Sequence, residues 1–270
     1  MADIPDVFLL GVTFFVSVGA SIISGMAGGG SGFIIAPFFM LIGLPPHLAT
    51  ATAKMNEVGV NASSIVAAKR ARRRERQYVT SEGAIVTTHP HNMLRSQAMA
   101  VLFGITMINV AFAAWLIPHL QAEGIKYIVG VLLIGMIPTL FINKKSFQPG
   151  MRSRRWRRAG YVIYSGVSFM QALFGMGIGM FISMVLMYAF GLPVTEANDI
   201  KRRLMMGQSS VLLILLLAQG VVLLPFGVAA LLGAVAGAQV GTLIGIKKGN
   251  LFIKKVLAGV MLVSGIVLFL

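Results

Sequence analysis

A diverged internal repeat constrains the fold of this chain more than any other feature. The run from Gly25 to Gly59, GMAGGGSGFIIAPFFMLIGLPPHLATATAKMNEVG, returns 148 positions later as LFGMGIGMFISMVLMYAFGLPVTEANDIKRRLMMG. The identical positions are Gly29 and Gly177, Phe33 and Phe181, Ile34 and Ile182, Gly43–Pro45 and Gly191–Pro193, Ala49 and Ala197, and Gly59 and Gly207. Lys54 falls on Arg202 in the same alignment. Two glycine-broken apolar segments, each followed by a helix with a cation at the same place, are typical of secondary transporters with a central anion site.

The composition of the chain places most of it in lipid. Its mean hydropathy is +0.85, and only 11% of its residues are charged, whereas a soluble domain carries about a quarter. The chain has no Cys, which excludes disulfides and thiolate metal sites. His89 and His91 flank Pro90, so a turn is expected there rather than a ligand pair, and neither a metal nor a cofactor is predicted. We therefore expect an all-α polytopic membrane protein.

The positive charge of the chain is concentrated in three short runs. The formal net charge is +15, and the runs span residues 69–76, 144–158 and 247–255. Because Lys and Arg are enriched in cytoplasmic loops, the runs are predicted to be cytoplasmic loops that meet anionic lipid headgroups, not nucleic acid. The amino terminus, MADIPDVF, has no Lys or Arg, so it is expected to be retained rather than cleaved as a signal peptide.

The lengths of the apolar segments predict which of them cross the membrane. A crossing helix needs about 20 apolar residues, and the segments near this length are 7–24, 47–68, 95–117, 124–142, 195–219, 223–246 and 250–270. Segments 31–43 and 177–190 are too short, so they are predicted to be half-helices or arms of re-entrant hairpins. Their partner arms are 7–24 and 159–174. Segment 78–94 is interrupted by Thr87–His91 and is given no role.

The charge runs and the spans together predict inverted-topology repeats. The first copy ends at the cytoplasmic run 69–76, whereas the second ends at 220–225, one span before the next basic run and therefore outside. Copies that end on opposite faces are related by an axis in the membrane plane. The predicted halves are residues 1–143 and 159–270, joined by a cytoplasmic basic linker at 144–158, with both chain termini outside.

Glycine clusters interrupt the apolar sequence before each short segment. The clusters are Gly28–Gly32, which includes Gly29, Gly30 and Ser31, and Gly175–Gly179, which includes Gly177. Unpaired backbone amides are tolerated at membrane depth only where protein or water covers them. The amides that begin each half-helix, with the positive end of its dipole, therefore suit an anion. The alternative is that these glycines only permit close helix packing.

One face of the long helix after each Gly-Leu-Pro turn carries ionisable residues. Polar residues recur there at helical spacing: Thr50, Lys54, Glu57, Asn61 and Ser64 in the first copy, and Thr195, Asp199, Arg202 and Ser209 in the second, with Asn198 and Arg203 alongside. Ionisable groups inside a membrane usually face a cavity or pair with each other. An ammonium and a guanidinium contributed symmetrically suit a compact oxyanion such as a sulfonate.

These features define a predicted substrate site and two alternatives to it. The predicted substrate-binding residues are Gly29, Gly30, Ser31, Thr50, Lys54, Gly177, Gly179, Asn198, Arg202 and Arg203. In the first alternative Lys54 and Arg202 extend to the headgroups, and in the second they form i,i+3 pairs with Glu57 and Asp199. Glu57 and Asp199 are candidates to carry a coupling proton, or else serve only in salt bridges.

Several motifs are shared with a known family. Gly-Gly-Gly-Ser-Gly-Phe at 28–33, Gly-Leu-Pro at 43–45, their weaker copies in the second half, and Gly237–Gly241 before the last basic run resemble the TauE/SafE family of sulfite and organosulfonate exporters. The resemblance covers nearly the whole chain. It implies a carrier of sulfite, sulfonates or related sulfur-containing anions in the inner membrane of a bacterial or archaeal cell.

Three functions are compatible with these observations. The first is a carrier that binds the anion between the repeats and exposes it alternately to the two sides. The second is a passive anion channel, because the same amides and cations also select anions in a pore. The third is a membrane subunit of a sulfur-relay enzyme complex, which the absence of a Cys nucleophile disfavours. The chain is therefore predicted not to be an enzyme.

Overall fold

Helices make up every regular element of the described chain. The computed structural model describes residues 7–27, 31–81, 96–119, 153–174 and 179–248, and the single residues Gly259 and Leu262. The elements are α1 (Val7–Ala27), α2 (Gly32–Leu41), α3 (Pro46–Ser81), α4 (Ser96–Leu116), the 3-10 turn η1 (Ile117–His119), α6 (Arg154–Phe174), α7 (Gly179–Phe190), α8 (Val194–Ala218) and α9 (Leu224–Lys248). The predicted all-α class is confirmed. The predicted span 124–142 and nearly all of 250–270 lie outside the described residues.

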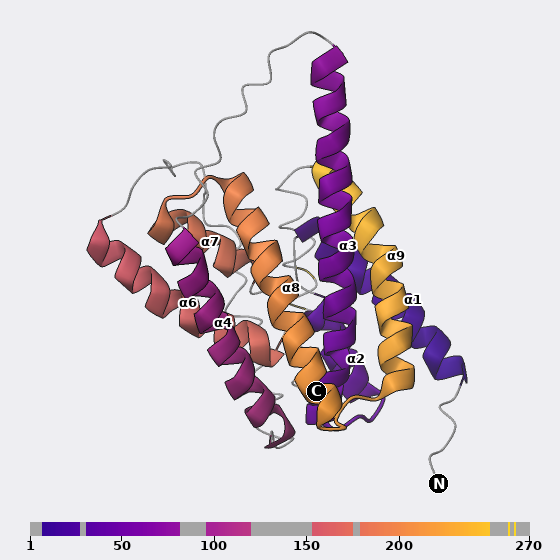
Figure 1. The fold of residues 1–270 in the computed structure, drawn as a ribbon. Coiled ribbons are helices and arrows are strands. Elements are labelled where there is room, and N and C mark those ends of the chain that lie inside the picture. Colours follow the sequence, from indigo (N-terminus) through magenta and orange to yellow (C-terminus); the bar gives the residue numbers. More distant parts are fainter. Residues whose placement is uncertain are drawn as a thin grey trace.

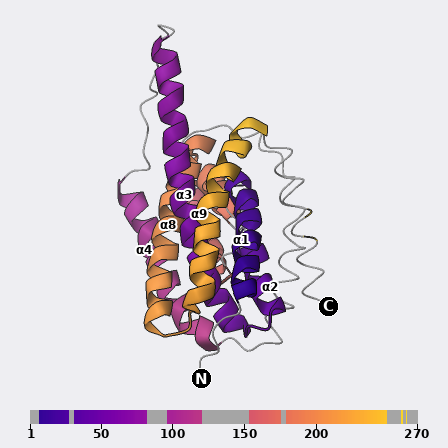
Figure 2. The same ribbon diagram turned by 90° about the vertical axis from the view of Figure 1, so that its right-hand side faces the viewer.

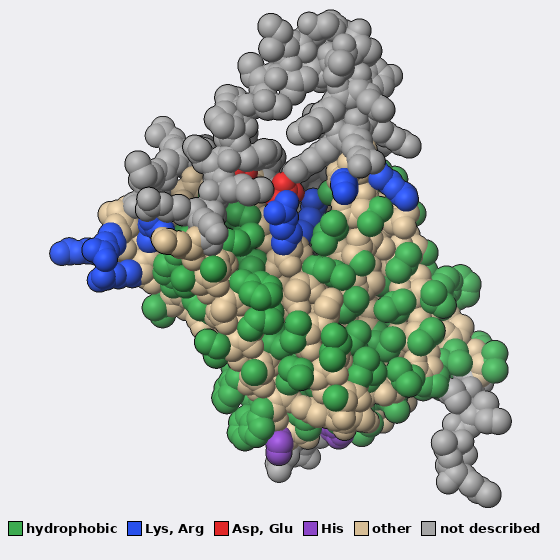
Figure 3. Space-filling view, in the orientation of Figure 1, with side chains coloured by type: hydrophobic (Ala, Val, Ile, Leu, Met, Phe, Trp, Pro, Cys, Tyr) green, Lys and Arg blue, Asp and Glu red, His purple; other side chains and the backbone are tan. Residues whose placement is uncertain are grey.

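The surface of the bundle is apolar over most of its height. Three of the described helices are long and apolar enough to cross a membrane, over Val7–Met26, Gln97–His119 and Leu224–Ile244. Large apolar side chains such as Phe15 and Ile108 are exposed on these helices, as expected for a surface solvated by lipid. Lys and Arg side chains gather along the upper edge of this apolar surface (Figure 3). We call this edge the basic side, and the opposite edge the far side.

The two short segments end in the same backbone turn. α2 and α7 are too short to cross the hydrocarbon core, and each is followed by a Gly-Leu-Pro turn that leads into a long helix. Gly43 and Gly191 occupy equivalent positions in these turns and both have positive φ, 91° and 73°. Glycine adopts this conformation without strain, whereas other L-residues do so at a cost. The repeat in the sequence is therefore a repeat in backbone conformation.

Replacing Gly191 with alanine is expected to destabilise the protein by about 1–2 kcal/mol, because a Cβ disfavours the left-handed region. The matched control is Gly166→Ala in the interior of α6, where an added Cβ meets no atom within 4 Å. That change is expected to stabilise slightly, because alanine is the better helix former. Thermal unfolding of both variants in detergent measures the difference, and equal melting temperatures would contradict the role given to Gly191.

Corresponding helices of the two halves run in opposite directions. In Figure 1, α1 and α3 run from the lower to the upper edge, while α6 and α8 run from the upper to the lower edge. The helix that follows each pair reverses again, so α4 runs downward and α9 upward. These directions are those that a two-fold axis in the membrane plane produces.

The fourth helix of each half packs against the other half. α9 lies along α1 and α3, and α4 lies along α6 and α8 (Figures 1 and 2). The matched glycines mark these contacts, since a Cβ on Gly59 would meet Leu231 and Ala234 of α9, and a Cβ on Gly207 would meet Phe103 of α4. We call α1, α2, α3 and α9 the first unit, and α6, α7, α8 and α4 the second unit.

Each unit has a hydrophobic core built from corresponding positions. Phe39 and Ala49 belong to the core of the first unit, together with residues of α1 and α9. Met187 and Ala197, which lie 148 positions later, belong to the core of the second unit, together with Leu102 of α4. The same alignment that defines the sequence repeat therefore also matches the two cores.

Small residues bring α1 and α9 into close contact. A Cβ added at Gly233, Gly237 or Gly241 would collide with backbone atoms of Phe14, Val18 or Ile22 of α1. These glycines recur every four residues along one face of α9, the arrangement that lets helix backbones approach closely in membranes. This glycine stripe therefore allows α9 to pack closely against α1 within the first unit.

Two predicted boundaries are wrong. The basic run 69–76 was expected in a loop, but α3 continues to Ser81, and Figures 1 and 2 show it rising well beyond the bundle. The run contains neither Gly nor Pro, and its Arg, Lys, Ala and Glu residues are strong helix formers. In the same way α6 begins at Arg154 instead of 159, so part of the predicted linker 144–158 is helical.

Candidate functional site

A buried ion pair lies between the two units. Lys54 and Glu57 of α3 are 2% and 7% exposed, and the Lys54 Nζ lies 3.0 Å from Glu57 Oε2. Gln171 of α6 is also buried and donates from Nε2 to Glu57 Oε1 at 2.8 Å. Both oxygens of the carboxylate are therefore engaged, one by each unit. Lys54 is thus not an interfacial anchor that extends to the headgroups.

Lys54 also contacts the end of a helix from the second unit. Its ammonium donates to the backbone oxygen of Gln171 at 3.3 Å. α6 ends at Phe174, so this oxygen is among the last four carbonyls, which have no partner within the helix. A cation is favoured there because the helix dipole is negative at its carboxyl end. The glycine cluster 175–179 of the opposite repeat begins in the sequence immediately after α6.

The counterpart cation is held differently. The side chain of Arg202 on α8 lies 3.9 Å from Asp199, and the two side chains are 25% and 24% exposed. Arg203 is exposed. The polar contacts of Lys54 are with Glu57 and Gln171, and Arg202 is not among them. The expectation that both cations meet in one central site is therefore not realised in this conformation.

The other predicted site residues are distributed over both repeats. Thr50 and Ser31 are buried in the first unit. Asn198, at the position equivalent to Thr50, accepts a hydrogen bond from Ser183 Oγ at 2.9 Å and so ties α8 to the half-helix α7. Gly179 is buried at the start of α7. The predicted residues Gly29, Gly30 and Gly177 lie outside the described residues.

Two residues of equivalent sequence position meet each other. Asn61 of α3 donates from Nδ2 to Ser209 Oγ of α8 at 3.1 Å, and these positions are 148 apart. Asn61 also donates to the backbone oxygen of Met205 at 3.4 Å. When equivalent residues of two repeats touch, the axis that relates the repeats passes close to them. This contact therefore lies near the pseudo-two-fold axis, between the ion pair of α3 and the ion pair of α8.

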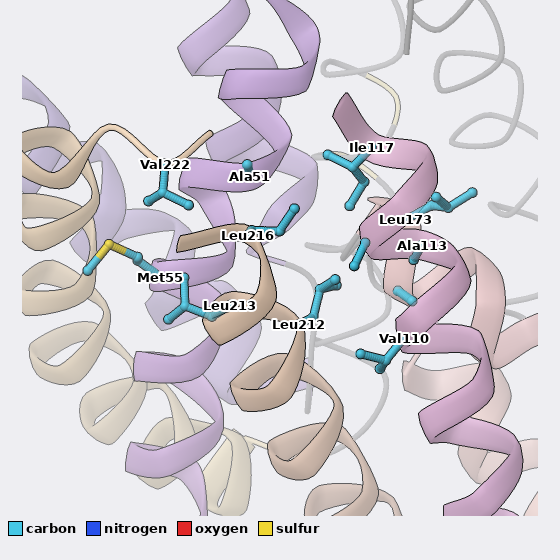
Figure 4. Close-up of a cluster of buried hydrophobic side chains, with 12 residues drawn as sticks. Ala51, Met55, Val110, Ala113, Ile117, Leu173, Leu212, Leu213, Leu216 and Val222 are labelled. Carbon is cyan, nitrogen blue, oxygen red and sulfur yellow. The ribbon is translucent and has the colours of Figure 1, made fainter. Parts of the chain in front are cut away.

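A hydrophobic cluster closes the interface between the units on the far side (Figure 4). We call it the far-side cluster. It includes Ala51 and Met55 of α3, Val110, Ala113 and Ile117 of α4 and η1, Leu173 of α6, Leu212, Leu213 and Leu216 of α8, and Val222. Its members are close to the ion pair along the chain, since Met55 follows Lys54 and Leu173 lies two residues after Gln171. It lies toward the far side of the ion pair, because Ala51 precedes Lys54 on α3, which runs from the far side to the basic side.

The basic side of the same interface has no comparable cover in the described part of the chain. Described clusters there lie within units, such as Val60 with Ala234 and Ala238 of α9. Above the far-side cluster, Asn61 of α3 makes polar contacts with α8. The partly exposed Asp199 and Arg202 lie further toward the basic side. Among the described residues, the site is thus enclosed unequally from the two sides.

Two polar residues of the interior were not among the predicted site residues. Gln171 pairs with Glu57 across 114 residues of sequence, a contact that leaves no local pattern. Asn56 donates to Ser17 and Ser21 of α1 at 2.6 Å and 3.2 Å, and thereby fixes α3 to α1 inside the first unit. A buried amide on an apolar helix is the signal for such a bond.

Comparison with known proteins assigns the chain to a family. The family described as sulfite exporter TauE/SafE matches residues 13–268. One similar protein is the probable membrane transporter protein YfcA of Escherichia coli strain K12, which is 26% identical over 248 residues, 91% of this chain and 84% of the relative. YfcA of Escherichia coli O157:H7 matches to the same extent. No solved structure matches the chain. The match over nearly the whole length shows that this chain belongs to the TauE/SafE family of membrane transporters.

Proposed function

We propose that the protein is a secondary transporter that carries a small sulfur-containing oxyanion, a sulfonate or sulfite, by alternating access between its two units. The observation that carries the proposal is the buried Lys54, whose ammonium contacts a backbone oxygen in the last turn of α6. A buried cation needs an anionic partner. The family match supports a sulfur oxyanion as that partner during transport.

The unequal cover of the site supports a carrier over a channel. The far-side cluster closes one end of the interface, whereas the basic end is polar. By the positive-inside rule the basic side is cytoplasmic, in the inner membrane of a bacterial or archaeal cell, with anionic headgroups around Lys69, Arg70 and the start of α6. The conformation then corresponds to a state that is closed to the outside.

Repeat symmetry suggests the form of the opposite state. In an inverted repeat, the alternate conformation is reached when the two halves exchange their local arrangements. The position equivalent to Gln171 is Ile23, near the end of α1. In the state open to the outside, Arg202 is expected to reach the last carbonyls of α1, while Lys54 is released from α6. Each cation then contributes to the anion site in turn.

Counterflow in proteoliposomes tests the function. With the membrane potential held at zero, vesicles preloaded with unlabelled sulfite or methanesulfonate should take up the labelled anion transiently above equilibrium, which a passive channel does not allow. The double variant Lys54→Gln/Glu57→Gln, which leaves no single buried charge, is expected to reduce this uptake at least tenfold. The matched control is Lys69→Gln/Arg70→Gln, which removes two exposed cations of the same helix and should preserve uptake. Linear, non-saturating flux without counterflow would favour the channel instead.

A further inference from the structure

Glu57 occupies the position that an anionic substrate needs. Its carboxylate holds the Lys54 ammonium at 3.0 Å and receives the Gln171 amide at 2.8 Å. An oxyanion bound to Lys54 would use the same donors. Without substrate, the carboxylate of Glu57 therefore acts as the counter-ion of Lys54 in its place.

Charge balance then requires Glu57 to be neutralised when the anion binds. Lys54 and Glu57 together carry no net charge, and a monoanion added beside them would leave one uncompensated negative charge in a buried site. A buried unpaired charge is strongly unfavourable. One proton bound by Glu57 restores neutrality, because Lys54 then pairs with the substrate. The protonated carboxyl gains an O–H donor, which can point to the bound oxyanion.

Among the described residues, the charged group that contacts Glu57 is Lys54. α1, α2 and α4 contain no titratable residue, and η1 contributes only His119, which is bound to the Trp115 backbone at the exposed end. α9 has only Lys247 and Lys248, at its last two positions. The charged residues of α8 are Glu196, Asp199, Lys201, Arg202 and Arg203, in its first three turns, and those of α6 are Arg154, Arg155, Arg157 and Arg158 at its start. The polar contacts of Glu57 are with Lys54 and Gln171.

We propose that Glu57 is the proton-coupling site of the transporter, so that one proton moves with each monoanion in the same direction. The inference rests on the proposed function. The proton comes from water on the open side, binds one carboxylate oxygen of Glu57 as the Lys54–Glu57 pair separates, and leaves on the other side when the pair forms again. No covalent bond between heavy atoms is made or broken, and transport of a monoanion is electroneutral.

Uptake of methanesulfonate driven by a pH gradient tests this coupling. Methanesulfonate is the anion of a strong acid, so its charge stays constant across the pH range used. With the exterior one pH unit more acidic than the lumen, wild-type vesicles should accumulate it about tenfold, since one unit is a tenfold proton gradient. A pH-sensitive dye in the lumen should record one proton per anion. An imposed membrane potential should leave the accumulation unchanged.

The variant Glu57→Gln separates coupling from transport. It leaves the Lys54 ammonium without its counter-ion, so it is expected to unfold at a lower temperature and to show slower, but measurable, counterflow. Because glutamine imitates the protonated carboxyl, this residual transport should show neither accumulation in the pH gradient nor proton movement. Asp199→Asn is measured in parallel. If that variant loses the accumulation while Glu57→Gln keeps it, or if net wild-type uptake in the pH gradient proceeds without proton movement, the coupling role of Glu57 is overturned and the transport function stands. Absence of counterflow for every sulfur oxyanion in the wild type would overturn both proposals.

Discussion

Replacing Lys54 with alanine is expected to cost about 3–5 kcal/mol of stability, the range typical when one partner of a buried ion pair is removed. The carboxylate of Glu57 is 7% exposed and would keep only the amide of Gln171 as a close polar partner. For a chain of this size, such a loss lowers the melting temperature by roughly 10 °C. Thermal unfolding in detergent measures this change directly, and anion binding should disappear at the same time.

Two comparisons identify the buried charge as the cause. Lys69→Ala removes an exposed lysine from the same helix and should change the melting temperature little, because isolated surface charges contribute little to stability. The double variant Lys54→Met/Glu57→Gln removes both charges of the pair and should recover most of the loss, since neutral groups are less costly to bury than a lone ion. If Lys54→Ala and Lys69→Ala unfold at the same temperature, the ion pair does not stabilise the fold.

The features that depend on local sequence were predicted well. The short helices α2 and α7 follow from apolar segments that end at Gly-Leu-Pro, and Gly43 and Gly191 both take the positive φ that only glycine adopts easily. The buried cation at position 54 follows from its place on a polar stripe in an apolar helix. In these cases the physical cause lies within a few residues of the feature itself.

The features that depend on distant contacts were not predicted. The partner of Glu57 is Gln171, and no periodicity in either segment encodes their contact. The packing of α9 against α1 and α3, and of α4 against α6 and α8, was also not predicted. A glycine stripe indicates that a helix packs closely, but it does not indicate which helix it contacts. The predicted end of α3 is wrong because a run of charged residues is compatible with a loop and with a helix. Arg and Lys favour helix, and α3 continues through the run.

Lys54 and Arg202 occupy equivalent positions in the two repeats but differ in burial. The alignment of the repeats does not predict this difference. Two repeats of similar sequence form equivalent sites, but in the proposed alternating-access mechanism the interface between the units is closed on only one side at a time. Lys54 lies beside the closed far-side cluster and is buried, whereas Arg202 lies toward the polar side and is partly exposed. Under the proposed mechanism, Lys54 and Arg202 would have equivalent environments only when the inward-open and outward-open conformations are considered together.

Fixing the far-side cluster with a covalent link is expected to abolish transport almost completely. The chain has no Cys, so the double variant Met55→Cys/Leu213→Cys places the only two thiols in the protein within this cluster, one in each unit. A short thiol-specific bifunctional reagent should join α3 to α8 and hold the far side closed. Alternating access requires this interface to open, so counterflow should fall to background and return after the link is reduced.

A second pair of cysteines distinguishes a locked gate from general damage. Val60→Cys/Ala234→Cys joins α3 to α9, and both residues lie in one small cluster within the first unit. Because these helices move together if each unit is rigid, linking them should preserve most of the counterflow. Each single-cysteine variant treated with the same reagent should also remain active. Full transport by the linked Met55/Leu213 variant would show that the units do not separate at the far side, and that the substrate path lies elsewhere in the bundle.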